Sequence, residues 1–125
     1  MIFGIGTDMI EVARVAEKTG KHAGFKEMVF SQKEIGYCEA MAKKYEHYAA
    51  RFAAKEAFFK AMGTGWKSGM AFNEIEITND DQGKPLISFL GNTATFVTEM
   101  KLGRIHVSLS HLKTMASAVV IIESL

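Results

Sequence analysis

A long apolar helix is the feature that most constrains what this chain can fold into. Residues 45–62 carry apolar side chains at helical spacing, and Gly63 follows them as a natural stop. Small and apolar residues cover most of the circumference, so the helix has to be packed on several sides. Two narrow polar seams interrupt this cover, namely Arg51 with Lys55 and Glu56 with Lys60. A chain of 125 residues suits one domain, and we expect this helix at its centre.

Strands and shorter helices flank the long helix. We predict strands over residues 2–6, 72–78, 86–90, 104–110 and 115–122, and short helices over residues 31–42 and 92–100. Ser31 and Glu34 have the spacing of a capping box, and Pro85 stands at the entry of a hairpin strand, where its missing N–H is tolerated. Helices grouped between hairpin-linked strands predict an α+β fold with an antiparallel sheet, over a single domain of residues 1–125.

The composition excludes several classes of protein. Hydrophobic residues make up 48% of the chain and charged residues 23%, values typical of a folded domain rather than a disordered one. The formal net charge of +1 gives no overall attraction to nucleic acid or membrane. No apolar run approaches the roughly 20 residues of a membrane span, and we expect no signal peptide. Cys38 is the only cysteine, so we expect a reducing, cytoplasmic setting.

Glu56 and Lys60 form one polar seam of the long helix. They are an i,i+4 pair, which on an open surface contributes only about 0.3–0.5 kcal/mol. Between phenylalanines the pair is partly desolvated and needs a stronger partner than water. A half-buried ion pair explains both residues without any function, and a site for a metal or phosphate is the alternative.

The end of the long helix offers a second signal. Gly63, Thr64 and Gly65 present consecutive N–H groups on flexible backbone just beyond Lys60. Such a nest can hold phosphate oxygens. Plain C-capping explains the same glycines, so the signal is weak when taken alone.

Asp8 lies where the first predicted strand ends. Thr7-Asp8 is expected to open a helix, with Asp8 and Glu11 as a capping box and Gly20 as the stop. An N-cap aspartate contributes about 1 kcal/mol and needs no further role. The functional alternative is a carboxylate that shares a Mg²⁺ ion with Glu56, because this ion is usually held by one or two carboxylates, waters and substrate phosphates.

A histidine and serine row follows near the C-terminus. In the strand "HVSLSH", His106 and Ser108 share one face, while Val107 and Leu109 share the other and have the character of core. A lone histidine here is more often a satisfied structural residue than a ligand. A row of this kind on the polar side of a sheet also suits phosphate.

Taken together, these motifs resemble the holo-acyl-carrier-protein synthases, the small bacterial 4'-phosphopantetheinyl transferases. The similarity rests on "GIGTDMIEVARV", "RFAAKEAFFKAMGTG", "IEITNDDQGKP" and "HVSLSH", which occur in family order almost from end to end. The resemblance implies transfer of the phosphopantetheine arm of coenzyme A to a serine of apo-acyl carrier protein, with adenosine 3',5'-bisphosphate as the other product. It also implies the 4'-phosphopantetheinyl transferase fold and a homotrimer with active sites between protomers.

The resemblance also implies roles for particular residues. Asp8 and Glu56 match the Mg²⁺ ligands and, with Lys60, the catalytic set. Coenzyme A binding maps to Lys60, Gly63, Thr64, Gly65, Pro85, His106 and Ser108. The basic first helix matches the docking surface for the acidic carrier protein, through Arg14, Lys18, Lys21 and Phe25, with His22 and Lys26 nearby.

The expected chemistry is attack of a serine oxygen on the β-phosphate of coenzyme A, for which catalysis is mostly positioning and charge neutralisation. Glu56 or a water on the metal ion is to take the serine proton, and the sequence does not choose between them. Two other functions stay open: a non-catalytic module that binds coenzyme A or carrier protein, and a structural oligomer. The first predicts binding without transfer, and the second predicts no binding of Mg²⁺ or coenzyme A.

Overall fold

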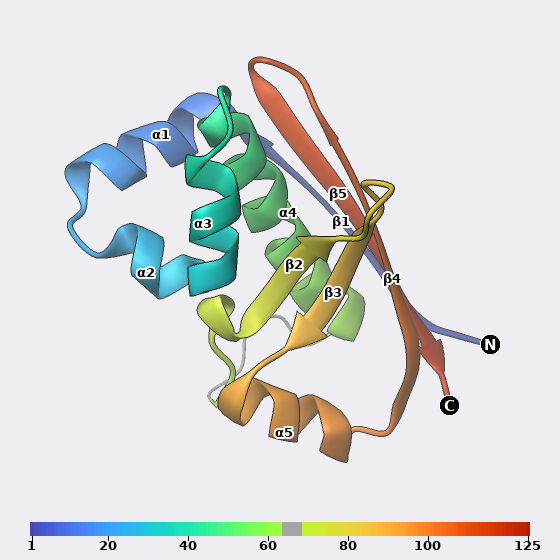
Figure 1. Cartoon of the computed structure of the whole chain (residues 1–125). Coiled ribbons are helices and arrows are strands. Elements are labelled where there is room, and N and C mark those ends of the chain that lie inside the picture. Colours follow the sequence, from blue (N-terminus) through green and yellow to red (C-terminus); the bar gives the residue numbers. More distant parts are fainter. Residues whose placement is uncertain (64–68) are drawn as a thin grey trace.

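The computed structural model describes residues 1–63 and 69–125 (Figure 1). In this part the elements are β1 (Ile2–Glu11), α1 (Val12–Lys21), α2 (Phe25–Val29), α3 (Gln32–Glu39), α4 (Lys44–Met62), the 3₁₀ helix η1 (Phe72–Glu74), β2 (Ile75–Asn79), β3 (Pro85–Phe89), α5 (Gly91–Glu99), β4 (Leu102–His111) and β5 (Met115–Ser124). The strands form an antiparallel sheet of order β1-β5-β4 and an antiparallel β2-β3 hairpin. The predicted α+β class is confirmed.

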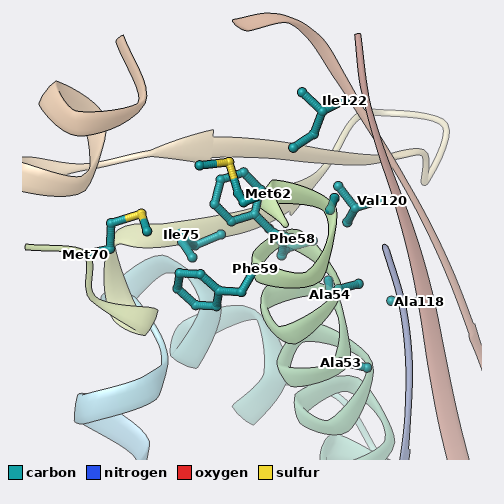
Figure 2. Close-up of a cluster of buried hydrophobic side chains, with 13 residues drawn as sticks. Ala53, Ala54, Phe58, Phe59, Met62, Met70, Ile75, Ala118, Val120 and Ile122 are labelled. Carbon is teal, nitrogen blue, oxygen red and sulfur yellow. The ribbon is translucent and has the colours of Figure 1, made fainter. Parts of the chain in front are cut away.

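Helix α4 lies at the centre, as its apolar circumference predicts. Its C-terminal half packs on β5 and β2, where Phe58 and Phe59 share one buried cluster with Ile75, Val120 and Ile122 (Figure 2). Its N-terminal half is buried in a second cluster with residues of α1, α2 and α3. The helix ends at Gly63, which adopts the left-handed conformation with φ of 81°, as predicted for a C-terminal glycine.

Strand β1 lies directly on α4. A Cβ atom added to Gly4 would lie 1.9 Å from the carbonyl oxygen of Ala61, and one added to Gly6 would lie 1.9 Å from that of Ala57. Only glycine permits this approach of a strand backbone to a helix backbone. The contact sets the position of the residues that follow on β1, Asp8 among them.

The predicted helix start at Thr7-Asp8 is wrong. Both residues belong to β1, which continues to Glu11 and pairs with β5 from Thr7↔Val119 to Glu11↔Met115. Helix α1 begins only at Val12, and its N-cap residue Glu11 makes no side-chain capping bond. Pairing with a distant strand satisfies the backbone here and overrides the local capping signal. Asp8 is therefore not a helix cap.

The first part of the predicted strand at residues 72–78 is also different. Residues 72–74 form η1, and only Ile75 and the residues after it join the hairpin. Glu74 turns away from strand pairing and accepts hydrogen bonds from the backbone N–H of Thr93 at 3.0 Å and from its hydroxyl at 2.7 Å, in the first turn of α5. The capping box of Ser31 and Glu34 is confirmed, and Pro85 is the first residue of β3 as expected.

One face of the β1-β5-β4 sheet has α4 on it, and the described residues leave apolar side chains exposed on the other. Because Gly4 and Gly6 face α4, strand alternation directs Ile5 and Met9 to the opposite face. Ile5 is 61% exposed and Met9 68% exposed. Large apolar side chains gathered on one face of a sheet are typical of an interface. Among the described helices, none is long and apolar enough to cross a membrane.

Candidate functional site

The close contact of β1 with α4 brings Asp8 to Lys60. The Lys60 ammonium donates to a carboxylate oxygen of Asp8 at 3.0 Å and to the carbonyl oxygen of Thr7 at 3.0 Å. The Asp8 side chain is only 16% exposed, whereas that of Lys60 is 56% exposed. Lys60 thus spans from the helix to the strand while keeping an open side toward solvent.

Glu56 lies one turn before Lys60 on the same helix. Burial raises the pKa of its carboxyl group, and the neighbouring charge of Asp8 raises this pKa further. The charges of Lys60 and Lys18 act in the opposite direction on the pKa of Glu56. Two carboxylates that repel each other form a place where a divalent cation gains energy by neutralising both.

The donor chemistry of this place fits Mg²⁺. Asp8 and Glu56 offer hard carboxylate oxygens, and within residues 1–63 and 69–125 no group of three or more metal-type side chains gathers anywhere. Mg²⁺ is commonly held by one or two carboxylates, with waters and substrate phosphates as the remaining ligands. A pair of carboxylates beside a lysine is therefore enough on the protein side.

The ion pair expected between Glu56 and Lys60 is replaced by a tertiary one. In the described part of the chain, the lysine pairs with Asp8 across the strand–helix contact rather than with the glutamate one turn away. A charge held between two elements of the fold is more restricted in position than an i,i+4 pair on one helix. The interpretation of Glu56 as a simple ion-pair partner is therefore not supported.

A pocket of about 510 Å³ opens beside Asp8 and Lys60. Side chains of β1, β4 and β5 line it, including Thr7, Ser108 and Ser117. His106 does not line this pocket and instead forms an ion pair with Glu123 on the same exposed face. Thr64 and Gly65, which were expected to bind phosphate, lie outside the described residues.

A second, smaller pocket of about 240 Å³ includes Pro85. Arg51 lines it and is 2% exposed; its guanidinium donates to Asn79 at 2.7 Å and lies 4.3 Å from the centre of the Tyr37 ring. The Nε atom of Arg51 has no hydrogen-bond partner among the described residues. An unpaired buried donor is costly, so this pocket suits an acceptor of negative charge.

Two histidines lie in the same pocket as Arg51. His47 and His111 line the same pocket, with ring centres 5.1 Å apart, and His111 also bonds to Glu46 at 2.8 Å. Burial lowers the pKa of His47, and the charges of His111 and Arg51 lower it further. Arg51 therefore supplies the positive charge of this pocket, while His47 favours its neutral form.

The two pockets are separate. Residues of β1, β4 and β5 line the first, whereas α3, α4, the β2-β3 hairpin and the outer strand β4 line the second. One chain does not bring Pro85 and Asp8 together. Of the residues predicted for one site, the structure thus groups Asp8, Glu56, Lys60 and Ser108, and places Pro85 elsewhere.

The predicted docking surface lies on α1 and α2. Arg14 is exposed, and the ammonium of Lys21 lies 3.0 Å from a carboxylate oxygen of Glu17. The ring of Phe25 packs edge-on against that of Phe52, with ring centres 6.4 Å apart. The ammonium of Lys18 lies 5.9 Å from the ring centre of Phe52, one turn before Glu56 on α4. This surface therefore borders directly on the cluster of Asp8, Glu56 and Lys60.

Comparison with known sequences decides the family. A family profile described as the 4'-phosphopantetheinyl transferase superfamily matches residues 4–114. The chain belongs to this superfamily. A holo-[acyl-carrier-protein] synthase of Cytophaga hutchinsonii is 46% identical over 123 residues, which are 97% of each chain. One from Geobacter sulfurreducens is 40% identical over 98% of each chain.

Solved structures of the superfamily agree with this assignment. The holo-[acyl-carrier-protein] synthase of Neisseria meningitidis superposes with a TM-score of 0.90 at 31% identity, covering 99% of this chain and 100% of that one. A holo-(acyl-carrier-protein) synthase of Bacillus anthracis in complex with CoA (3',5'-ADP) has a TM-score of 0.83 at 36% identity, covering 100% and 99%. The expected family and its fold are confirmed.

The arginine pocket was not predicted from the sequence. From the sequence, Arg51 belongs to a polar seam of the long helix and Pro85 is a predicted contact of coenzyme A, and nothing in the sequence brings the two together. The available signal was a charged residue in an otherwise apolar helix, since such a residue needs a partner when it is buried. Its partner Asn79 lies 28 residues away in the sequence, so local pattern does not reveal it.

Proposed function

We propose that this chain transfers the 4'-phosphopantetheine arm of coenzyme A to a serine hydroxyl of an apo-acyl carrier protein. The products are the holo-carrier protein and adenosine 3',5'-bisphosphate. The observation that carries the proposal is the cluster of Asp8, Glu56 and Lys60, in which the ion pair of Asp8 and Lys60 lines a pocket and the Glu56 carboxylate lies near both charges. Membership of the superfamily supports it, as do relatives that are named holo-[acyl-carrier-protein] synthases.

In the reaction, the serine oxygen forms a bond to the phosphorus that carries pantetheine, and the bond from this phosphorus to the bridging oxygen of the pyrophosphate breaks. The bridging oxygen leaves on the 5'-phosphate of the nucleotide. Asp8 and Glu56 would hold Mg²⁺, which supplies charge neutralisation to the pyrophosphate when bound. Lys60 adds a positive charge at the phosphate, and its open side leaves room for that contact.

The serine proton is assigned to the Glu56 carboxylate, directly or through one water. Glu56 lies one turn before Lys60 on α4, so a serine that approaches the phosphate beside Lys60 also approaches this carboxylate. Asp8 lies against Lys60, which favours its role as a fixed charge. This division of roles follows from the different surroundings of the two carboxylates.

The nucleotide end of coenzyme A is assigned to the pocket of Arg51 and Pro85. A phosphate would give the unpaired Nε of Arg51 the acceptor that it lacks among the described residues. His106 and Ser108 remain proposed neighbours of the phosphates, and Gly63 remains a proposed contact of the pyrophosphate and pantetheine end.

The separation of Asp8 and Pro85 within one chain supports assembly, because Asp8 lies on one outer strand, β1, and the pocket of Pro85 adjoins the other, β4. If β1 of one copy adjoins β4 of another, the pocket of Asp8 and the pocket of Pro85 come together. The exposed Ile5 and Met9 supply apolar surface for such a contact. We therefore assign a homotrimer with sites between protomers, working in the cytoplasm. Arg14, Lys18, Lys21 and Phe25 would receive the acidic carrier protein.

The test is the intact mass of an apo-acyl carrier protein after incubation with this protein, coenzyme A and Mg²⁺. We expect a gain of one phosphopantetheine group, and no gain when the metal is removed with a chelator. Binding of coenzyme A without any gain would make the chain a binding module. Binding of neither Mg²⁺ nor coenzyme A would leave only a structural oligomer.

A further inference from the structure

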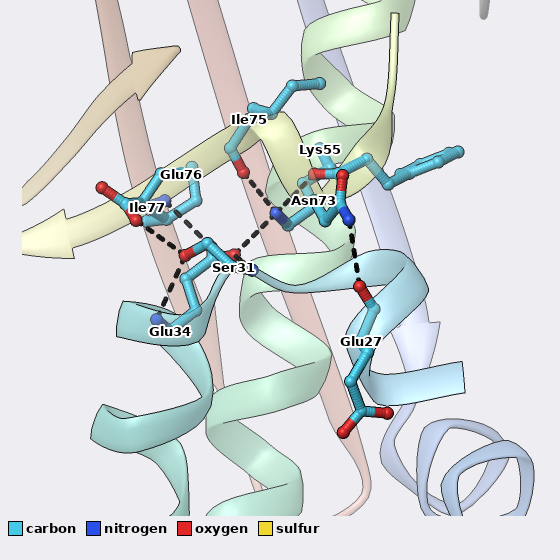
Figure 3. A network of polar contacts seen from close by, with 9 residues as sticks. Glu27, Ser31, Glu34, Lys55, Asn73, Ile75, Glu76 and Ile77 are labelled. Atoms are coloured by element: carbon cyan, nitrogen blue, oxygen red, sulfur yellow. Dashed lines mark hydrogen bonds and ion pairs between the residues drawn. The ribbon is translucent and has the colours of Figure 1, made fainter. Parts of the chain in front are cut away.

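Lys55 is fully buried on α4, directly before Glu56, and its ammonium is held on all sides (Figure 3). It donates to Glu34 of α3 at 2.8 Å, to the carbonyl oxygen of Phe72 at 2.8 Å, and to the carbonyl oxygen of Ile75. A lysine ammonium has three N–H donors. Each of the three is therefore used, on three different points of the fold.

The partner carboxylate is held equally completely. The oxygen of Glu34 that binds Lys55 also accepts the backbone N–H of Ser31 at 2.9 Å, and its other oxygen accepts the backbone N–H of Ile77 at 2.9 Å. The network thus joins α3, α4, η1 and the start of β2. A buried polar network whose members are all satisfied is rigid and specifies one arrangement of its elements.

The location of this network determines the rotation of α4. Successive residues of a helix are about 100° apart, so Glu56 leaves α4 about 100° from Lys55, and Lys60 about 140° from it. With the Lys55 side chain fixed on one side, the other two side chains are directed to the side where β1 lies. On that second side, Gly6 lies against the backbone of α4 at Ala57.

We propose that Lys55 is a positioning residue for the transfer reaction, and that its contacts with Glu34, Phe72 and Ile75 hold α4 at the rotation that points Glu56 and Lys60 at Asp8. The proposal rests on the function proposed above. Lys55 does not touch the reacting groups. It acts through Glu56, its neighbour in the chain, and through Lys60 farther along the same helix.

Two variants test the proposal: Lys55→Met, which removes the ammonium, and Lys55→Met with Glu34→Gln, which removes both charges of the pair. We expect kcat to fall by about 100-fold, because misplacement of a reacting group by about 1 Å has such an effect. We expect Mg²⁺ to bind about 10–100-fold more weakly, as when a group that orients a metal ligand is lost. Calorimetric titration of Mg²⁺ into the protein saturated with coenzyme A measures this, and KM for the carrier protein should not change.

Tyr48→Phe is the matched control. Tyr48 is also fully buried on α4, and its hydroxyl also ties α4 to α3, through Glu39 at 2.7 Å. Its bond contacts neither η1 nor β2, so we expect lower stability with wild-type kcat and Mg²⁺ affinity. If Tyr48→Phe lost kcat and Mg²⁺ affinity to the same degree as Lys55→Met, Lys55 would have no positioning role beyond its contribution to packing.

Hydrogen exchange in the unaltered protein gives a second test that does not depend on the variants being folded. If Lys55 couples α4 to β2, the amide hydrogens of Ile77 and Phe59 open with the same free energy. Exchange of Ile77 well ahead of Phe59 overturns the proposal, and so does wild-type kcat with wild-type Mg²⁺ affinity in the double variant. Absence of transfer by the wild-type protein would instead contradict the proposed function.

Discussion

The two polar seams of α4 contain similar residues and have opposite surroundings. Arg51 and Lys55 are buried, and every donor of Lys55 has an acceptor within the fold. Lys60 lines a pocket and is more than half exposed, and Glu56, one turn before it, has a carboxyl pKa raised by burial and by the charge of Asp8. A charge whose donors are all satisfied inside the protein, such as that of Lys55, stabilises the fold. A charge that is left partly satisfied is available to a ligand, and Arg51, with its Nε unpaired among the described residues, belongs to this second kind.

The largest loss of activity is expected from a substitution at Glu56, in the second seam. Glu56→Gln keeps the size of the side chain and removes its charge, so the fold should persist while the proposed metal ligand and proton acceptor is lost. We expect the rate of transfer to fall by about 10³-fold, the scale on which preorganised charge contributes to catalysis. The rate of mass gain of the carrier protein measures this. A variant that transfers at the wild-type rate would remove Glu56 from the site.

Two lysine variants test whether the two seams contribute differently to the stability of the fold. Lys55→Met leaves Glu34 buried without its cation, and we expect a loss of about 3–5 kcal/mol in the free energy of unfolding. Lys60→Met removes a partner from an ion pair that is open to solvent, and we expect a change of less than about 1 kcal/mol. Urea denaturation measures both values. Equal losses of unfolding free energy in Lys55→Met and Lys60→Met would contradict the view that the first lysine is structural and the second is not.

The glycine contact beneath the second seam gives a further prediction. In Gly6→Ala the new methyl group meets the carbonyl oxygen of Ala57, which is backbone and cannot turn aside. We expect a loss of about 1–3 kcal/mol in unfolding free energy, and slower transfer, because Asp8 moves away from Lys60. Gly20→Ala, at a position with no atom near the added Cβ, is the control. Destabilisation by Gly20→Ala to the same degree would contradict the role of close approach.

A smaller effect is expected from Glu39 at the end of α3. Hydrogen bonds from Tyr48 and Lys26 lower the pKa of its carboxyl group from 4.5 to about 2. A carboxyl group whose pKa is lower in the folded state stabilises the fold above its unfolded pKa. This contribution should therefore be complete above pH 4.5 and decline as the pH falls toward 2. Tyr48→Phe should show a weaker decline in unfolding free energy over this interval; an identical pH profile would contradict the assignment.

Much of the fold follows from local pattern. The predicted helix 45–62 differs from α4 by one residue, because helical periodicity and a terminal glycine agree. The prediction at Asp8 failed because its capping signal is local, whereas pairing with β5 joins residues more than 100 positions apart. No periodicity in the sequence indicates which of these two requirements prevails.

The candidate site could also be predicted only in part from the sequence. From the residues alone, a Mg²⁺ site shared by Asp8 and Glu56 is one of two alternatives, and the resemblance to a family favours it and adds Lys60. The structure places Lys60 against Asp8, with Glu56 one turn away on the helix. The role of Lys55 could not be predicted, because its acceptors at Glu34, Phe72 and Ile75 meet only when the whole chain has folded. Contacts between distant segments determine which charge of a helix is structural and which faces a ligand.

The central claim is that the second seam performs phosphopantetheinyl transfer. Its most direct test is a time course of the intact mass of apo-acyl carrier protein with coenzyme A and Mg²⁺, for the wild-type protein and for Glu56→Gln side by side. We expect the wild-type protein to add one phosphopantetheine to the carrier protein and the variant to add essentially none. A carrier protein whose mass stays unchanged with the wild-type protein, or rises equally with both, would contradict it.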